Sequence, residues 1–374
     1  MMLIRPTYAI IDLDAVKFNV RNIKAALPAG TLFCAVNKAD GYGHGSVMTA
    51  KAAIEAGADW VAVAIPEEAA PLRDEGIEAP ILVLGPASIS QWRLAAELDL
   101  RMVVASEDCV QCARSVSRET GKTMRLHLKV DTGMNRIGVR TEQELLRMLE
   151  LIAEEPSLEL EGLMTHFAAA DEADKSYTQM QKARFDECAE LVRQRGFSPM
   201  LHAANSGGAL DCPGTAYDMV RAGIALYGCY PSGEVCKDIK LRPAMSLHTK
   251  ISFIKTVEAG AKLSYGCTFT APKEMRIATL PIGYADGFNR LLSNRGEVLI
   301  GGRRARVVGR VCMDQILVDI TDIEGVQLHD EAVCIGKQGR DAITAEEVAN
   351  WCGTINYEIL CAISPRVPRL YVEG

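Results

Sequence analysis

Long apolar stretches and a surplus of basic residues are both missing from this 374-residue chain. No run of about ten consecutive apolar residues occurs, whereas a membrane-spanning helix needs about 20. The opening residues, Met1 to Pro6, lack a long apolar core, so we expect no signal peptide. Lys and Arg number 41 against 48 Asp and Glu, and the net charge of −7 argues against a nucleic-acid-binding surface. We therefore expect a cytoplasmic protein with neither membrane nor nucleic acid as a partner.

Paired metal-binding motifs are also missing, although the chain has 12 cysteines. Without a secretion signal, these cysteines imply a reducing compartment and free thiols. Cys109 and Cys112 form a lone Cys-x-x-Cys pair, and a zinc site would need a second pair or nearby histidines. Spacing i, i+3 in a helical segment explains the pair better, so we expect no metal site. The sequence also contains no internal repeat, low-complexity stretch or flexible linker.

The length of the chain exceeds what one ordinary core accommodates, so two domains are expected. From residue 8 to about 240, short apolar runs alternate with longer segments of helical periodicity, such as Asp14–Leu27, Thr141–Glu154 and Lys175–Gly196. Eight such units predict a (β/α)8 barrel; a doubly wound open sheet is the main alternative, because periodicity cannot show closure. The eight strand candidates are Leu32–Val36, Trp60–Ala64, Ile81–Leu84, Met102–Ala105, Leu126–Val130, Leu160–Thr165, Leu201–Ala204 and Met219–Leu226.

Polar residues lie at or just beyond the carboxyl ends of five of these runs: Lys38, Asp131, His166, Asn205 and Arg221. In a barrel those ends converge on the face that carries the chemistry. A single polar residue after a strand means little. A lysine, a histidine and an arginine at three such ends indicate one pocket.

Lys38 follows the apolar run Thr31 to Val36 and precedes a glycine-rich turn with one tyrosine. This pattern is typical of a buried strand that delivers an amine to the mouth of a pocket. Desolvation there disfavours the ammonium form, which makes Lys38 a candidate base or Schiff-base former. The alternative is a surface lysine in a turn between a strand and a helix.

Helical periodicity nearly vanishes from about residue 241, where only Ala345–Cys352 is typical of a helix. Short β-rich runs bounded by glycine predict a mostly β second domain. These runs are Ser246–Val257, Arg276–Pro281, Glu297–Ile300, Arg306–Val311, Ile316–Ile320 and Ala332–Ile335. We assign residues 8–240 to the barrel and residues 241–374, together with residues 1–7, to the β domain.

Nine stretches, spread over both domains, together match one family. They are Val36–Gly45, Lys129–Gly138, Met164–Ala168, His202–Ser206, Arg221–Gly228, Leu263–Gly266, Pro281–Gly287, Gly309–Asp314 and Thr354–Glu358. On these residues the chain resembles the bacterial alanine racemases that depend on pyridoxal phosphate, over essentially its whole length. The visible departure is at Asn37 and Gly41, where the family more often has Val and Ala.

The resemblance implies that a proton leaves one face of an amino acid and another returns on the opposite face, with pyridoxal 5'-phosphate as the electron sink. Lys38 is then the Schiff-base lysine and one base, and Tyr265 is the second base. A tyrosine has an unperturbed pKa of ~10, so its phenolate needs nearby positive charge or hydrogen bonds. His166 and Arg221 match that network. The alternatives are a packing role for Tyr265 and a structural role for His166.

Arg221 also matches the residue that faces the pyridine nitrogen of the cofactor. Because arginine stays cationic and accepts no proton, the ring nitrogen should remain unprotonated and the cofactor should be a weaker electron sink. A surface salt bridge is the alternative for this arginine. The cofactor phosphate needs backbone donors and hydroxyls more than charge. The matched contacts are Tyr42, Ser206, Gly223, Ile224 and Tyr357.

Arg136 and the backbone of Met313 match the residues that hold the substrate carboxylate. Lys129 matches a lysine that in this family is often carbamylated, which turns a cation into an anion that orients Arg136. His202 and Asp314 lie in matched motifs and are expected to support the site.

The two expected bases lie in different domains, since Lys38 is in the barrel and Tyr265 in the β domain. In the family, the two domains that meet at one site come from different subunits, so the resemblance implies a homodimer with composite sites. The residues that resemble the lining of the entrance are Tyr284, Asp171 and Arg290.

The expected substrates are L- and D-alanine, either to supply D-alanine for peptidoglycan or to degrade it. A racemase of another amino acid, such as serine, or of broad specificity remains open; serine-preferring relatives typically have a smaller polar residue at the position of Tyr357. A non-catalytic pyridoxal-phosphate-binding barrel would not need the β domain with Tyr265. A fold relative that decarboxylates amino acids should have an acidic residue in the place of Arg221.

Overall fold

The computed structural model describes residues 5–373, which form two compact units. The first, here called the barrel unit, consists of Ala15–Gly41 and Ser46–Arg242. The second, here called the β unit, consists of the described residues up to Asp14, Tyr42–Gly45 and those from Pro243 onward. Two predictions concern residues that are only partly described. They are the absence of a signal peptide, which rests on Met1 to Pro6, and the assignment of residues 1–7 to the β domain.

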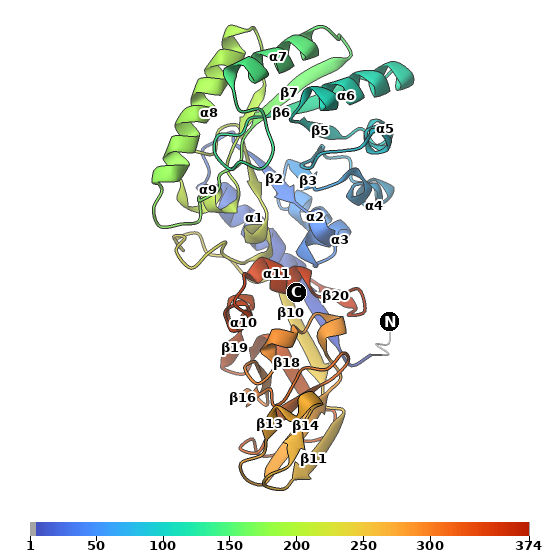
Figure 1. Ribbon diagram of the computed structural model, residues 1–374, viewed down its shortest axis with the longest axis vertical. Coiled ribbons are helices and arrows are strands. Elements are labelled where there is room, and N and C mark those ends of the chain that lie inside the picture. Colours follow the sequence, from blue (N-terminus) through green and yellow to red (C-terminus); the bar gives the residue numbers. More distant parts are fainter. Residues whose placement is uncertain (1–4, 374) are drawn as a thin grey trace. The chain divides into compact units, whose positions relative to one another are not determined.

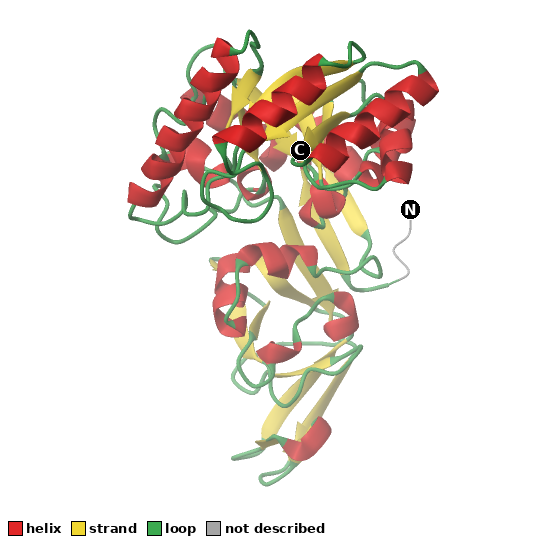
Figure 2. Cartoon of the chain, turned by 45° about the horizontal axis from the view of Figure 1, so that its top comes forward, coloured by secondary structure: helices red, strands yellow, loops and turns green. Residues whose placement is uncertain are grey.

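The barrel unit is built on eight parallel strands in the order β8-β7-β6-β5-β4-β3-β2-β9. Helices surround these strands in Figures 1 and 2. The end strands are also joined, because Asp218 N donates to Leu201 O and Arg221 N donates to Ala204 O, each over 3.0 Å. The predicted (β/α)8 barrel is therefore confirmed, and the open sheet is excluded. The strands are β2 (Leu32–Val36), β3 (Trp60–Val63), β4 (Ile81–Val83), β5 (Arg101–Val104), β6 (Met124–Lys129), β7 (Leu158–Met164), β8 (Met200–His202) and β9 (Met219–Ala222).

The three helices that the sequence predicts in this unit, α1, α7 and α8, begin and end within two residues of the predicted limits. Thr141 caps α7 in a capping box with Glu144, and Ser88 caps α5 in the same way with Gln91, which satisfies backbone donors that each helix start leaves open. The helices are α1 (Leu13–Ala26), α2 (Lys38–Tyr42), α3 (Ser46–Glu55), α4 (Ala70–Asp74), α5 (Ile89–Glu97), α6 (Glu107–Thr120), α7 (Glu142–Ala153), α8 (Ser176–Gln194) and α9 (Ser206–Asp211), with 3-10 turns η1 (Pro66–Glu68) and η2 (Ile224–Tyr227). The predicted strand Met219–Leu226 is too long, since it runs into η2.

Burial explains why some barrel strands, β3 and β4 among them, are uniformly apolar. Every residue of β3, β4 and β9 is buried, as expected for parallel strands covered on both faces. Large side chains such as Phe33, Trp92 and Phe185 are fully buried. A rigid strand framework of this kind fixes where the residues just beyond the strand ends lie.

The β unit contains three separate sheets and few helices. The largest has the order β16-β15-β18-β10-β1-β20, with β19 paired to β18; the others are β11-β14-β17 and β12-β13. The elements are β1 (Tyr8–Asp12), β10 (Met245–Lys250), β11 (Phe253–Val257), β12 (Lys262–Leu263), β13 (Phe269–Thr270), β14 (Met275–Leu280), β15 (Glu297–Ile300), β16 (Arg303–Arg306), β17 (Ile316–Asp319), β18 (Glu331–Gln338), β19 (Asp341–Ile343), β20 (Arg369–Val372), the helices α10 (Ala345–Cys352) and α11 (Asn356–Cys361), and the 3-10 turns η3 (Tyr265–Cys267), η4 (Tyr284–Asp286) and η5 (Arg290–Leu292).

The mostly β character of this unit and the helix Ala345–Cys352 are confirmed, but three details differ from the prediction. Ser246–Val257 is two strands, because β10 pairs with β1 and β18 while β11 pairs with β14. Arg306–Val311 is wrong as a strand, since the strand is Arg303–Arg306, which pairs with β15. The barrel does not begin at residue 8, because β1 pairs with β10 and β20 in the largest sheet of the β unit.

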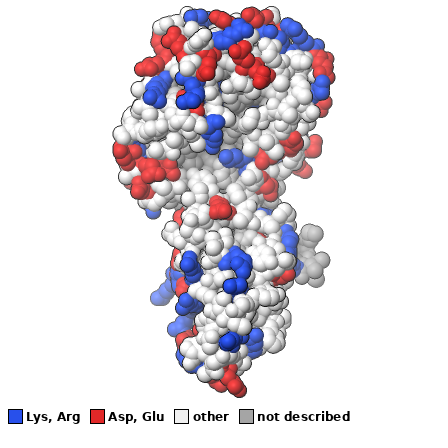
Figure 3. Space-filling view, viewed as in Figure 1, with Lys and Arg blue, Asp and Glu red and all other residues white. Residues whose placement is uncertain are grey.

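Charges are mixed on the surface. On the face shown in Figure 3, acidic and basic side chains are interspersed over the barrel unit. Among the described residues, no helix combines the length and the hydropathy needed to cross a membrane.

Candidate active site

Five of the predicted residues lie at the carboxyl end of the barrel strands. Lys38 comes two residues after the end of β2, Lys129 and His202 are the last residues of β6 and β8, and Arg221 is inside β9. His166 follows β7 by two residues. These strand ends belong to one closed sheet, so the fold gathers a strongly basic set of side chains on a single face.

The turn after Lys38 is left-handed. Ala39, Asp40 and Tyr42 all have a φ of 52°, and the intervening Gly41 has a φ of 62°. Non-glycine residues rarely adopt this region, and runs of them are rarer still. A sequence argument that assumes right-handed geometry does not predict this turn.

Carboxylates hold this turn in place. One oxygen of Glu68 accepts the N–H of Ala39 and the other accepts the N–H of Ala64, each over 2.7 Å, so Glu68 ties the end of β2 to the end of β3. Asp40 accepts the N–H of Ser46 at 2.9 Å, which anchors the start of α3.

Asn37 and Gly41, the two residues that differ from the family pattern, both contact the same side chain, that of Thr49. Asn37 is fully buried, and its Nδ2 donates to Thr49 Oγ1 at 2.8 Å. That same hydroxyl oxygen lies 2.8 Å from where a Cβ on Gly41 would stand, and the Tyr227 hydroxyl lies 3.3 Å from it. Gly41 is therefore required both by its positive φ and by close packing.

Arg221 is the centre of the basic set. Its side chain is buried, and its Nη2 donates to the carbonyls of Thr165 at 2.8 Å and Ala203 at 2.9 Å. Its Nη1 lies 2.8 Å from His202 Nδ1, and its Nη2 lies 3.4 Å from His166 Nδ1. Burial lowers the pKa of Arg221 to about 10, so the group remains a cation at neutral pH.

A chain of buried imidazoles continues from Arg221 into the barrel. A guanidinium only donates hydrogen bonds, so His202 Nδ1 accepts the one from Arg221. In the neutral ring the proton is then on His202 Nε2, which donates to His127 Nδ1 over 2.8 Å. His127 Nε2 then donates to Glu161 at 3.1 Å. Burial lowers the pKa of both His127 and His202, which keeps the two rings neutral. Trp60 packs edge-on against His127, with ring centroids 5.6 Å apart.

His127 and Glu161 are not among the predicted residues. His127 stands two residues before Lys129 on β6, so the two-residue period of a strand places both on one face. That periodicity is the signal in the sequence that points to His127.

Lys129 is buried and surrounded by positive charge. Burial, followed by the charges of Arg221 and Arg136, lowers the pKa of Lys129 to about 8. Burial and the charge of Arg221 likewise hold the pKa of His166 well below its ordinary value. A cationic lysine is therefore disfavoured here, and an anion would be favoured.

Arg136 is exposed and lies in the loop that follows β6, whose two ends are joined by backbone hydrogen bonds. Val139 N donates to Lys129 O at 3.0 Å, and Asp131 N donates to Val139 O at 2.8 Å. Within the loop, one oxygen of Asp131 accepts the N–H groups of Gly133 and Asn135 at 3.0 and 2.9 Å. Asp131 is thus engaged with backbone and shapes the loop that carries Arg136.

Ser206, Gly223 and Ile224 form a small donor-rich corner. The Ser206 hydroxyl oxygen accepts the N–H of Gly223 at 2.9 Å and that of Ala225 at 3.3 Å. A hydroxyl that accepts two bonds still has its own proton to donate. This corner can therefore donate to an anion such as a phosphate.

The other residues predicted to act as a base or to bind cofactor or substrate belong to the β unit. Tyr265 is 71% exposed in η3, beside Ser264, whose hydroxyl donates to Arg310 O at 2.6 Å. Met313 is 52% exposed and adjoins Asp314, which pairs with Arg366. The rings of Tyr42 and Tyr357 lie 6.1 Å apart, so this expected pair of phosphate ligands shares one location.

Two of the three expected entrance residues also lie together. Tyr284 and Arg290 line one cavity of about 410 Å³ in the β unit, together with Asn289. Asp171 belongs to the barrel unit.

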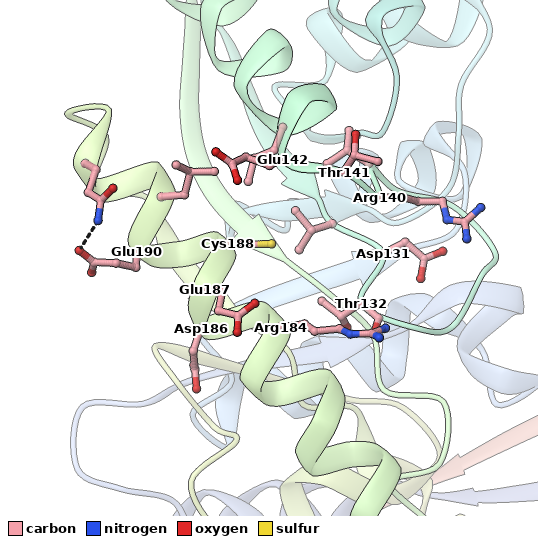
Figure 4. A pocket seen from close by; sticks show the side chains of 15 residues that line it. Asp131, Thr132, Arg140, Thr141, Glu142, Arg184, Asp186, Glu187, Cys188 and Glu190 are labelled. Atoms are coloured by element: carbon pink, nitrogen blue, oxygen red, sulfur yellow. Dashed lines mark hydrogen bonds between the residues drawn. The ribbon is translucent and has the colours of Figure 1, made fainter.

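A larger cavity, of about 920 Å³, lies between α7 and α8 in the barrel unit (Figure 4). It is lined by five carboxylates and two arginines, and by none of the residues predicted to bind cofactor or substrate. Asp131 is among these carboxylates, so it is the strand-end residue that borders this cavity. The acidic lining is unsuited to a phosphate or a carboxylate substrate.

Comparison with known families gives matches over both units. Residues 11–231 match the family model described as "Alanine racemase, N-terminal domain", and residues 244–371 match "Alanine racemase, C-terminal domain". An alanine racemase of Desulforamulus reducens is 46% identical over 98% of this chain and 99% of its own length. An alanine racemase of Methanococcus maripaludis is 45% identical over the whole of both chains.

Solved structures agree with these matches. The structure of an alanine racemase from Bacillus anthracis with bound L-Ala-P superposes with a TM-score of 0.95 at 43% identity, covering 100% of this chain and 97% of the other. A histidine racemase from Leuconostoc mesenteroides superposes with a TM-score of 0.91 at 30% identity, covering 100% and 99% of the two chains.

Proposed function

Because this chain belongs to the alanine racemase family, we propose that it interconverts L- and D-alanine with pyridoxal 5'-phosphate as its cofactor. The observation that carries the proposal is the buried basic set around Arg221 and Lys129. Neither residue forms an ion pair with any residue that the structure describes. A set of this kind favours an added negative charge over a further cation, here a carbamate on Lys129 and the amino-acid carboxylate that Arg136 would hold near it.

The donor set of the barrel unit fits this cofactor. Ser206, Gly223 and Ile224 would hold the phosphate, Lys38 would attach the aldehyde carbon, and Arg221 would donate to the ring nitrogen. Since Arg221 is cationic and donates also to His202, the ring nitrogen would stay unprotonated. When bound, the cofactor supplies the electron sink that lets the α-proton leave.

The chain's own residues then move the protons. Lys38 Nζ would take or return the α-proton on one face, and Tyr265 Oη would do so on the other. Arg136 and the Met313 N–H would hold the substrate carboxylate. A carbamate on Lys129 would be the anion that orients Arg136, which the lowered pKa of Lys129 supports, because only a neutral amine reacts with carbon dioxide.

We also propose a homodimer in which each site combines the barrel unit of one chain with the β unit of the other. This follows from the family resemblance and from the division of the two expected bases between the two units. Tyr357 would restrict the side-chain pocket, which favours a methyl group over the larger side chain of serine or histidine. In the cell, the protein would act in the cytoplasm on D-alanine, for cell-wall peptidoglycan or in D-alanine catabolism.

The test is a panel of single enantiomers, including alanine, serine and histidine, incubated with protein and pyridoxal phosphate and separated on a chiral column. We expect racemisation of alanine in both directions, well above that of serine and histidine. Borohydride reduction followed by peptide mass spectrometry should place the cofactor on Lys38. Faster racemisation of another amino acid, or cofactor fixed on a different lysine, would contradict the proposal.

A further inference from the structure

A fully buried carboxylate, Asp286, lies in the β unit close to the segment that contains Met313. One oxygen of Asp286 accepts the N–H of Gly283 at 3.0 Å. The other lies 2.7 Å from Arg5 Nη1 and 3.5 Å from Arg366 Nε. A buried carboxylate is costly unless it is paired, so this arrangement indicates a position with a strict requirement for charge.

The turn that Asp286 holds, Gly283–Gly287, is packed directly on Cys312 and Met313. A Cβ on Gly283 would lie 2.4 Å from Cys312 O and 2.3 Å from Met313 O, so only glycine allows this approach. The next two N–H groups bind the same two carbonyls. Tyr284 N donates to Cys312 O and Ala285 N donates to Met313 O, each over 3.0 Å.

These bonds fix the direction of one particular N–H. The carbonyl of Cys312 and the N–H of Met313 belong to the same peptide group, which is planar and trans, so the two point in opposite directions. When Tyr284 binds the carbonyl of Cys312, the Met313 N–H must therefore point away from the turn. The other side of Met313 is held as well, because Arg366 Nη2 lies 2.8 Å from the carboxylate of Asp314.

We propose that Asp286 is a positioning residue that aims the Met313 N–H at the substrate carboxylate. Asp286 acts through Gly283 and Tyr284 on one side of Met313 and through Arg366 and Asp314 on the other. This inference rests on the proposed function, in which the Met313 N–H is one of the two groups that hold the carboxylate.

The test is Asp286→Asn, which keeps an acceptor for Gly283 but removes the charge that attracts the two arginines. An N–H that binds the carboxylate in the ground state and the transition state alike changes KM rather than kcat. We expect the KM for L- and D-alanine to rise about tenfold, with kcat changed by no more than about twofold. Asp341→Asn is the matched control, because Asp341 is paired with Arg304 elsewhere in the β unit and should leave KM unchanged.

A second readout does not depend on turnover. Propionate has the carboxylate of alanine but no amine, and its binding to the cofactor-loaded protein can be followed by calorimetry. We expect its Kd to rise in parallel with KM in Asp286→Asn, while the amount of cofactor that borohydride fixes on Lys38 stays the same. If Asp286→Asn fails to fold, Arg366→Gln is the second variant and should raise both constants, by a smaller factor.

A fall in kcat or in thermal stability, with KM and the Kd for propionate unchanged, would show that Asp286 is only structural and overturn the proposal. A wild-type protein that does not racemise alanine, or does not bind propionate, would instead contradict the proposed function, so the two failures are distinguishable.

Discussion

Each unit contains a polar cluster built around a buried charged side chain, and the two clusters differ in their balance of charge. The β-unit cluster, Asp286 with Arg5 and Arg366, joins a buried carboxylate to two cations. The barrel cluster, here defined as Lys129, His166, His202 and Arg221, is basic throughout; burial lowers the pKa of each member, and the charge of Arg221 lowers the pKa of the other three further.

The difference separates two uses of buried charge. A paired cluster needs no ligand to satisfy it, and it can hold backbone in a fixed geometry. A cluster with charge of one sign is unfavourable until an anion arrives, which is typical of a site arranged for binding rather than for stability. The proposed racemase would use the first cluster to aim a donor and the second to favour a carbamate on Lys129 and to place Arg221 at the ring nitrogen of the cofactor.

The largest expected effect concerns the division of labour between the units. Lys38→Ala and Tyr265→Ala should each lower activity by about 10²–10⁴-fold, the usual contribution of a positioned base. In heterodimers made by mixing the two inactive variants, one site has both lesions and the other has none. Activity should recover to about half that of the wild type, as two-fold symmetry requires.

The control for this mixing experiment is each variant taken through the same dissociation and reassociation alone. No recovery, despite heterodimers verified by differential tags, would mean that both bases serve a site within one chain and would remove the shared-site model.

Acidic pH should weaken the barrel unit through its histidines. His127, His166 and His202 have lowered pKa values in the folded protein, so they stay neutral there. In the unfolded chain the same histidines have an ordinary pKa of about 6.5 and take up protons below that pH. Stability is therefore complete above that pH and lost as the pH falls below it. The slope should approach about 1.4 kcal/mol per pH unit for each histidine, or about 4 kcal/mol per unit for three.

Urea unfolding at pH 7.5, 6.5 and 5.5 measures this slope. His202→Asn removes one titrating ring and should make the slope shallower, and His329→Asn, at an exposed position in the β unit, is the matched control substitution. Equal slopes in all three proteins would show that the barrel histidines are not the cause.

An intermediate effect is expected at Lys129. With a pKa of about 8 instead of 10.5, roughly 100-fold more of its amine is neutral at pH 8 than in an ordinary lysine. In ¹³C-labelled bicarbonate, NMR should show one carbamate signal that Lys129→Arg abolishes and that Lys273→Arg, at an exposed lysine, does not. Lys129→Arg should also raise the KM for alanine about tenfold, a loss of about 1.4 kcal/mol. A spectrum without that signal would leave Lys129 as a simple cation.

The smallest effect is the coupling energy between Asn37 and Gly41, two residues close to Lys38 in the chain that belong to neither cluster. Gly41→Ala should cost about 1–3 kcal/mol, because alanine is strained at this φ and its Cβ meets Thr49 Oγ1. Asn37→Val removes the donor that holds that hydroxyl, so Gly41→Ala should be milder in its presence. A double-mutant cycle by urea unfolding should give a coupling of about 1 kcal/mol, and strictly additive losses would contradict the contact.

The barrel can be predicted from the sequence because its signals are local. Buried parallel strands are continuous apolar runs, and the order of the runs alone places the residues beyond their ends, from Lys38 to Arg221, on one face. The β unit is harder to predict, because its strands are short and their pairing is not local. Arg306–Val311 has the composition of a strand, yet the ladder with β15 stops at Arg306.

The prediction of the candidate active site from the sequence has the same limit. Residues within a recognisable motif can be identified from the sequence, but those that act through contacts between distant elements cannot. Asp286 stands out in the sequence only as part of a motif, since its role depends on two arginines at positions 5 and 366 and on the backbone at 312. The imidazole chain through His127 depends likewise on the register of β6, β7 and β8.

The left-handed turn after Lys38 has a consequence for the order in which the molecule folds and opens. Local preference favours the right-handed form at each of its non-glycine residues, by about 1–2 kcal/mol apiece. The turn can therefore persist only after β2, α3 and Glu68 are in place, and it should form late. In native-state hydrogen exchange, the amides of residues 39–42 should open in a sub-global step that leaves β2 protected. Heat or denaturant would then disrupt the proposed Schiff-base site at Lys38 while the barrel around it is still folded.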